Sequence, residues 1–99
     1  MSDLIERLEA ELKSVLDPEV GLNIIDLGLV YSLNVDDEGA IHVAMTLTSR
    51  GCPVGPLIVE EAENTLKTLN PGKQVYISLV FDPPWSPERI SEEGRAMLQ

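Results

Sequence analysis

The sequence predicts a two-layer α+β sandwich, in which amphipathic helices cover one face of a mixed three-stranded sheet. Apolar residues recur at helical spacing in three segments and alternate with polar residues in three others. These segments follow one another in the order α-β-β-α-β-α. With 99 residues in the chain, we expect residues 1–99 to form a single domain.

Three segments have the apolar spacing of amphipathic helices. The first begins near Asp3 and is expected to end at Pro18, because the residue before a proline is pushed out of the helical region. The second spans about 54–69, and the last begins at Ser86 with Pro87 in its first turn. The expected apolar stripes are Leu4, Ile5, Leu8, Leu12, Val15 and Leu16; Val54, Ile58, Ala62, Leu66 and Leu69; and Ile90, Gly94, Met97 and Leu98.

Residues 29–35, 41–48 and 75–81 alternate with the period of two that is typical of half-buried strands. The segment 36–39 is a hairpin connection, so the first two strands are expected to be antiparallel neighbours. The second helix can serve as a crossover to the third strand, which predicts a mixed sheet. The expected inward residues are Leu29, Tyr31, Leu33 and Val35; Ile41, Val43, Met45 and Leu47; and Val75, Ile77, Leu79 and Phe81.

The net charge of −10 argues against binding to nucleic acid or to an anionic membrane surface, since both depend on clustered Lys and Arg. Aromatic residues make up only 4% of the chain, so the core must be aliphatic. The N-terminal segment has no signal-peptide pattern, and no apolar run is long enough to cross a bilayer. We therefore expect a cytoplasmic protein.

Cys52 is the single cysteine, which excludes an internal disulfide. It lies just before the second expected helix, whose free N–H groups favour an anionic thiolate, and Arg50 can add to that effect. If the second and third strands are parallel, its loop (48–56) and the Asp82–Ser86 loop lie at the same sheet edge, where ligand sites tend to form. The alternative is that Cys52 is a small buried apolar residue.

The loops carry further polar residues with a structural and a functional interpretation. Asp17, Glu19 and Asp26 are carboxylates in one stretch, and turn or capping hydrogen bonds explain Asp17 and Asp26 equally well. Thr48 and Ser49 precede Cys52 and could cap the second helix instead. The remaining candidates have mainly structural explanations: Trp85 as a packing residue and His42 on the alternate face of its strand, well separated from Cys52.

Four motifs stand out in the loops and adjoining strands: Asp17-Pro18-Glu19, residues 23–31 (NIIDLGLVY), residues 45–53 (MTLTSRGCP) and residues 82–87 (DPPWSP). Together they resemble the metal–sulfur cluster biosynthetic family, which includes SufT-like and PaaD-like iron–sulfur assembly domains. The similarity covers almost the whole chain, in the family's order and spacing. Arg50 stands where the family usually has a proline, which affects only the shape of the loop.

The resemblance implies an iron–sulfur cluster assembly or targeting factor, not an enzyme, with an iron–sulfur cluster assembly domain-like fold. It implies that Cys52 is the functional cysteine and a transient cluster or metal ligand, with Asp17, Glu19, Thr48 and Ser49 beside it. Its partners would be the assembly machinery, as in the SUF system, and recipient apoproteins.

Clusters are normally held by four thiolates and one protomer offers one, so we expect a homodimer, or a partner that supplies the other ligands. Two alternatives remain open. The chain could be a non-catalytic interaction adaptor in which Cys52 is structural, or a thiol-dependent enzyme, although neither a resolving cysteine nor a base is evident.

Overall fold

A computed structural model describes residues 2–49 and 51–98 of the chain. Along the sequence it contains α1 (Ser2–Leu12), β1 (Val30–Val35), β2 (Ile41–Met45), α2 (Gly55–Leu69), β3 (Val75–Leu79), a 3-10 turn (Pro87–Arg89) and α3 (Glu92–Leu98). The expected order of three helices and three strands is confirmed. No helix among these residues is long and apolar enough to span a membrane.

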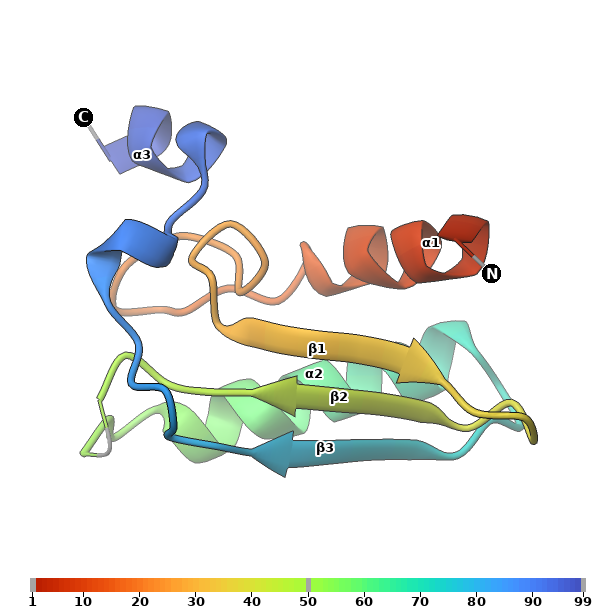
Figure 1. The fold of residues 1–99 in the computed structure, drawn as a ribbon. Helices are drawn as coiled ribbons and strands as arrows, with labels where there is room; N and C mark the ends of the chain where they lie inside the picture. The colour runs from red at the N-terminus through yellow and green to blue at the C-terminus, as the bar shows by residue number, and fades with distance from the viewer. Residues whose placement is uncertain (1, 50, 99) are drawn as a thin grey trace.

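The sheet has the strand order β1-β2-β3 and is mixed, as expected (Figure 1). β1 and β2 are antiparallel, with Leu33 opposite Val43, whereas β2 and β3 are parallel, with Val43 opposite Ile77. The Asp36 carboxylate accepts the N–H of Ala40 at 3.0 Å and thereby closes the hairpin between β1 and β2. Because β2 and β3 run in the same direction, the loops that follow them both begin at the same end of the sheet, where these strands end.

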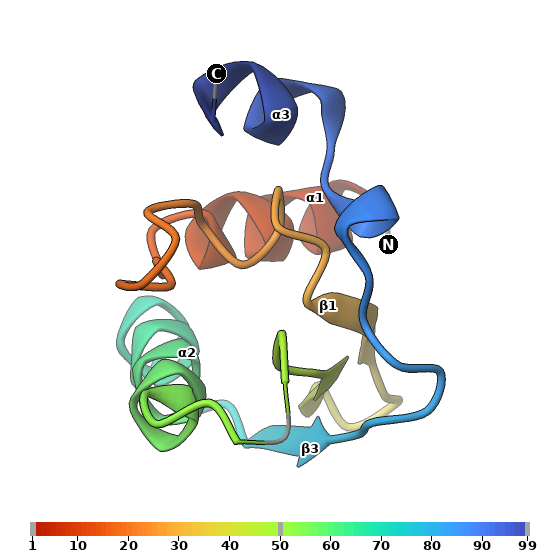
Figure 2. The ribbon, with the colours of Figure 1, turned by 90° about the vertical axis from the view of Figure 1, so that its left-hand side faces the viewer.

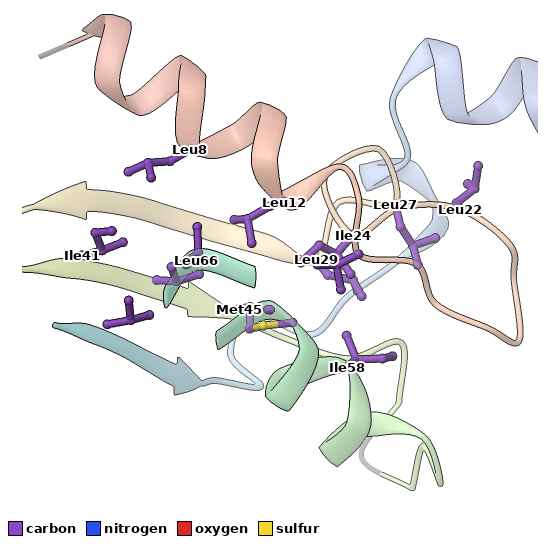
Figure 3. Packing of buried hydrophobic residues seen from close by; sticks show 14 residues of the cluster. Leu8, Leu12, Leu22, Ile24, Leu27, Leu29, Ile41, Met45, Ile58 and Leu66 are labelled. Carbon is purple, nitrogen blue, oxygen red and sulfur yellow. The ribbon is translucent and has the colours of Figure 1, made fainter. Parts of the chain in front are cut away.

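α1 and α2 lie together on one face of the sheet (Figure 2). Their apolar stripes and the inward residues of the strands enclose one aliphatic cluster, shown in Figure 3. The four expected inward residues of the β2 segment, from Ile41 to Leu47, are all buried. The largest fully buried side chains of the cluster are Leu8, Leu12, Leu22, Ile24, Leu27, Leu29, Met45, Ile58 and Leu66.

The expected end of the first helix at Pro18 is wrong, because α1 ends at Leu12. The following residues pair with the returning chain: the Ile24 N–H donates to the Val15 carbonyl, and Leu16 forms an isolated bridge with Asn23. This pairing satisfies backbone groups that would otherwise continue the helix. It also leaves Leu16 49% exposed, outside the core.

The single C-terminal helix expected from Ser86 is also wrong. The chain forms a 3-10 turn at Pro87–Arg89, becomes extended at Ile90 and begins α3 only at Glu92. The Ser91 side chain interrupts the helix, since its Oγ accepts the Gly94 N–H at 3.0 Å, as a capping residue does. The end of the expected stripe, Met97 and Leu98, is exposed.

In two places the burial of strand residues differs from the alternation expected from the sequence. A register shift between Val30 and Ser32 breaks the phase of β1, so that Val30 and Tyr31 are both half-buried. Leu79, expected to face the core, is 43% exposed. It lies at the end of the edge strand β3, beside the site described next.

Candidate functional site

Cys52 lies in a tight turn between the end of β2 and the start of α2, and only 9% of its surface is exposed. Its N–H donates to the Ser49 carbonyl at 3.3 Å, and its own carbonyl accepts the Gly55 N–H at 3.2 Å. A Cβ at Gly55 would lie 2.5 Å from Leu47 Cδ1, so glycine lets α2 begin against the Leu47 side chain, which would otherwise have to shift. These contacts hold the thiol at the carboxyl ends of the parallel strands.

The Glu19 carboxylate contacts the thiol. Cys52 Sγ lies 3.6 Å from Glu19 Oε1, within the range of a thiol–carboxylate hydrogen bond. Glu19 comes from the loop after α1, so two segments that are distant in sequence meet at the sulfur.

Asp17 holds this loop in shape. Its side chain is buried, with 1% exposure, and Oδ1 accepts the Glu19 N–H at 2.9 Å, an Asx-turn hydrogen bond. Its N–H donates to the Leu22 carbonyl and its carbonyl accepts the Gly21 N–H. Asp17 therefore positions Glu19, and the turn interpretation of Asp17 is confirmed.

Thr48 and Ser49 contribute less directly. The Ser49 carbonyl accepts the Cys52 N–H, whereas the Ser49 side chain is exposed and Thr48 is half-buried. Val54 occupies the N-cap position of α2 and makes no side-chain cap bond, so neither Thr48 nor Ser49 caps this helix. Arg50, expected to act on the thiol, lies outside the described residues.

A hollow of about 640 Å³ adjoins Cys52 at the exposed edge of β3 and the first turns of α2. Most of its wall is apolar, and two acidic side chains of α2 stand in it. Glu63 is paired with Lys67 at 2.6 Å. The hollow is lined by Leu47, Cys52, Pro56, Val59, Glu60, Glu63, Leu79 and Phe81.

The sequence placed a ligand site at the loop of Cys52, which connects β2 to α2. It did not identify Glu60 and Glu63 of α2 as part of the wall.

A complete metal site is not formed by one copy of the chain. Within residues 2–49 and 51–98, no group of three or more His, Cys, Asp or Glu side chains is placed to hold a metal ion. At the thiol itself, Cys52 and Glu19 bring together one sulfur and one carboxylate. Any iron held here needs further ligands from another molecule.

Asp26 does not belong to the site. Its Oδ2 accepts a hydrogen bond from Asn23 Nδ2 at 2.8 Å and its Oδ1 accepts one from Ser91 Oγ at 2.9 Å. The bond from Asn23, followed by that from Ser91, lowers the pKa of the Asp26 carboxyl against the opposing effect of its burial. The turn interpretation of Asp26 agrees with its bond to Asn23, which lies within the turn before β1, and the bond from Ser91 joins this loop to the residue that precedes α3.

The Asp82–Ser86 loop starts at the same edge as the cysteine loop but turns away from Cys52. It passes β1 on the side away from α2 (Figure 2). Trp85 Nε1 donates to the Leu27 carbonyl at 2.8 Å, and the Tyr31 hydroxyl donates to the Pro83 carbonyl at 2.8 Å. Two of the four sequence motifs, 23–31 and 82–87, therefore fasten the fold together.

His42 lies near the start of β2, at the opposite end of the strand from the cysteine turn. Its Nε2 lies 2.8 Å from Asp36 Oδ2, and its ring stacks on Tyr76 with the ring centroids 5.2 Å apart. The hydrogen bond with His42 lowers the pKa of the Asp36 carboxyl. The structure confirms that Cys52 and His42 do not form a nucleophile–base pair.

Comparisons with known proteins agree on one family. The sequence profile described as iron-sulfur cluster assembly protein matches residues 5–79. The Fe-S protein maturation auxiliary factor YitW of Bacillus subtilis is 40% identical over 95 residues, which cover 96% of this chain and 93% of that protein. The Fe-S protein maturation auxiliary factor SufT of Staphylococcus aureus is 43% identical over 84 residues, covering 85% of this chain and 96% of that protein.

A solved structure agrees with the fold. The crystal structure of a domain of unknown function, DUF59, from Bacillus anthracis has a TM-score of 0.92 to this chain at 37% identity. The match covers 98% of this chain and 92% of that one. The matched part of the chain therefore includes the cysteine turn and the C-terminal segment.

Proposed function

Because the chain belongs to the iron–sulfur cluster assembly protein family, we propose that it helps to mature iron–sulfur proteins as an assembly or targeting factor. Its relatives in Bacillus subtilis and Staphylococcus aureus are named maturation auxiliary factors, and the match extends over nearly their whole length. On this proposal the chain acts in the cytoplasm, as a factor without turnover of its own. Its partners are the assembly machinery and recipient apoproteins.

The observation that carries this proposal is the pairing of Cys52 with Glu19 beside the hollow. A thiolate is the protein ligand that iron–sulfur clusters most commonly use. A thiol must lose its proton to bind a metal, and Glu19 Oε1, 3.6 Å from the sulfur, is the carboxylate in place to accept it. Cys52 would thus bind the iron of a cluster, and Asp17 would keep Glu19 in position.

The cluster would be cargo held for a short time. The chain has one cysteine, so three of the usual four thiolates must come from elsewhere. A second copy of the chain, a small thiol or the recipient's own cysteines could supply them. An incomplete site releases its cluster readily, which suits a factor that passes the cluster on.

An adaptor function is the second candidate, and the 9% exposure of Cys52 favours it. A sulfur this enclosed can serve as a packing group, as most unpaired cysteines do. On this interpretation the surface of the chain recruits the recipient, and the thiol takes no part in the chemistry. The two candidate functions predict different effects on iron–sulfur protein maturation when the Cys52 sulfur is removed.

Replacement of Cys52 by serine tests the choice. Serine keeps the small polar side chain beside Glu19, so we expect the free energy of unfolding to fall by no more than about 1 kcal/mol. We expect maturation of iron–sulfur enzymes to be lost in cells that depend on this chain. Cys52→Ala is the matched control, because it removes the sulfur without adding a hydroxyl.

Maturation that continues undiminished in both variants contradicts the role of Cys52 as a ligand and supports the adaptor function. Anaerobic reconstitution with iron and sulfide is the second readout. Wild-type protein should gain the visible absorption of a cluster that Cys52→Ser lacks.

A further inference from the structure

The outer edge of β3 is open. β3 is the last strand of the sheet, and no strand among residues 2–49 and 51–98 pairs with its outer side (Figure 1). The strand Val75–Leu79 contains no charged residue and no proline. Exposed edge strands usually carry such residues as protection against pairing with another chain, so this edge is available for strand addition.

The hydrogen bonds between β2 and β3 show which main-chain groups of β3 point to the open edge. At its two ends, β3 is bonded to the β2 segment through even-numbered residues: Gln74 accepts the Ile41 N–H, and Val80 donates to the Met45 carbonyl, both at 2.8 Å. Main-chain groups of a strand point to alternate sides from one residue to the next. The N–H and C=O groups that point to the open edge therefore belong to the odd-numbered residues Val75, Ile77 and Leu79.

This edge leads to the hollow beside Cys52. Leu79, 43% exposed, is the last residue of β3 and also lines the hollow, together with Phe81 and Cys52. A strand paired with β3 would thus have its side chains at this end next to the thiol. An apolar side chain of that strand fits the wall of the hollow, most of which is apolar.

Charge distinguishes between the possible occupants. Glu60 stands at the hollow and Glu19 contacts Cys52, whereas Glu63 is already paired with Lys67, so a complementary strand carries a Lys or Arg that faces Glu60 beside its apolar residue. The equivalent strand of a second copy has no charged residue to meet these carboxylates, and the whole copy carries a charge of −10. A segment of a different polypeptide matches the site better than a second copy does.

We infer that the edge of β3 binds an extended segment of the recipient protein as a fourth strand, with an apolar residue in the hollow and a neighbouring Lys or Arg facing Glu60. This inference rests on the proposed function and adds how the recipient is held. Main-chain hydrogen bonds supply affinity that does not depend on the recipient's sequence, and the hollow adds selectivity. Strand addition brings cysteines of the recipient near Cys52.

The test uses a labelled, capped peptide of alternating Val and Thr with one Leu-Lys pair. A second peptide has the same sequence but is N-methylated at alternate amides.

Two variants of the protein change the proposed site. Leu79→Pro removes an N–H that points to the open edge but no bond to β2, and Leu79→Lys places a charge at the hollow. Leu57→Lys is the matched control, since Leu57 is 63% exposed on α2 and lines a different depression. Fluorescence anisotropy measures binding, amide hydrogen exchange locates it, and circular dichroism confirms that each variant is folded.

We expect the peptide to slow exchange at the odd-numbered amides of β3. Binding should be at least tenfold weaker for Leu79→Pro, for Leu79→Lys and for the N-methylated peptide, and within twofold of wild type for Leu57→Lys. Peptide binding is measured without iron or sulfide, so a failure of Cys52 in maturation and a failure of strand addition are separate results. Absent binding, unchanged affinity in both Leu79 variants, protection elsewhere, or β3 amides already protected by a second copy overturns the inference.

Discussion

Gly28 should be the glycine at which a methyl group does the most damage to the fold. Its φ of +82° is one that residues with a side chain rarely adopt. A Cβ at this position would overlap the Arg89 carbonyl oxygen and lie 2.7 Å from the Arg89 Cβ. The backbone of the C-terminal segment is thus packed directly on the glycine, and Gly28→Ala must move that segment.

Gly21 provides the matched comparison. Its φ of +85° imposes the same backbone strain, but a Cβ there meets no atom within 4 Å. Strain in the left-handed region costs about 1–2 kcal/mol in either variant, and overpacking adds about 1–3 kcal/mol in Gly28→Ala alone. We expect Gly21→Ala to lower the free energy of unfolding by about 1–2 kcal/mol and Gly28→Ala by about 2–5 kcal/mol.

Urea denaturation followed by circular dichroism measures both variants against the wild type. The excess loss in Gly28→Ala is also expected as a melting temperature at least about 4 °C below that of Gly21→Ala. Equal losses in the two variants would refute the argument, because they would show that the contact with Arg89 does not constrain the chain.

Three further predictions concern the core, the C-terminal anchor and assembly. Leu47→Asp places a charge at a position that is 5% exposed, so we expect a loss above about 3 kcal/mol in urea denaturation, against about 1 kcal/mol at most for Cys52→Ser. The lowered pKa of Asp26 means that its ionised form stabilises the fold above the ordinary aspartate range near pH 4, and this stability is lost as pH falls through the folded-state pKa. Asp26→Asn should therefore make the free energy of unfolding depend less on pH in the acid range and lower it by about 1–3 kcal/mol at neutral pH. An unchanged dependence on acid pH contradicts this prediction. Because a cluster usually needs four thiolates, we predict a dimer in sedimentation equilibrium, and a monomer both with and without iron argues against it.

The sheet could be predicted from the sequence because its signal is local. Alternation correctly assigned Ile41, Val43, Met45 and Leu47 to the buried face, although Thr46 between them is buried as well. The crossover through α2 indicated the parallel pairing with β3. These features depend on side-chain period and connection length, both of which are read directly from the chain.

Features that depend on contacts between distant segments could not be predicted this way. α1 ends early because Val15 accepts a bond from Ile24, and the last helix is interrupted because Ser91 is held by Asp26. The contact between Glu19 and Cys52 joins residues 33 apart in the sequence. Periodicity carries no information on such pairings, so the polar residues of the site were found only as separate candidates.

The hydrogen bonds that attach the C-terminal segment affect which part of the molecule unfolds first. Trp85–Leu27 and Ser91–Asp26 close loops of 58 and 65 residues, yet α3 itself has one buried residue, Gly94. An element with so few buried residues opens locally before the rest of the fold. We therefore expect the amides of α3 to exchange before those of the sheet, α1 and α2, while Trp85 and Ile90 keep the preceding segment packed on the core.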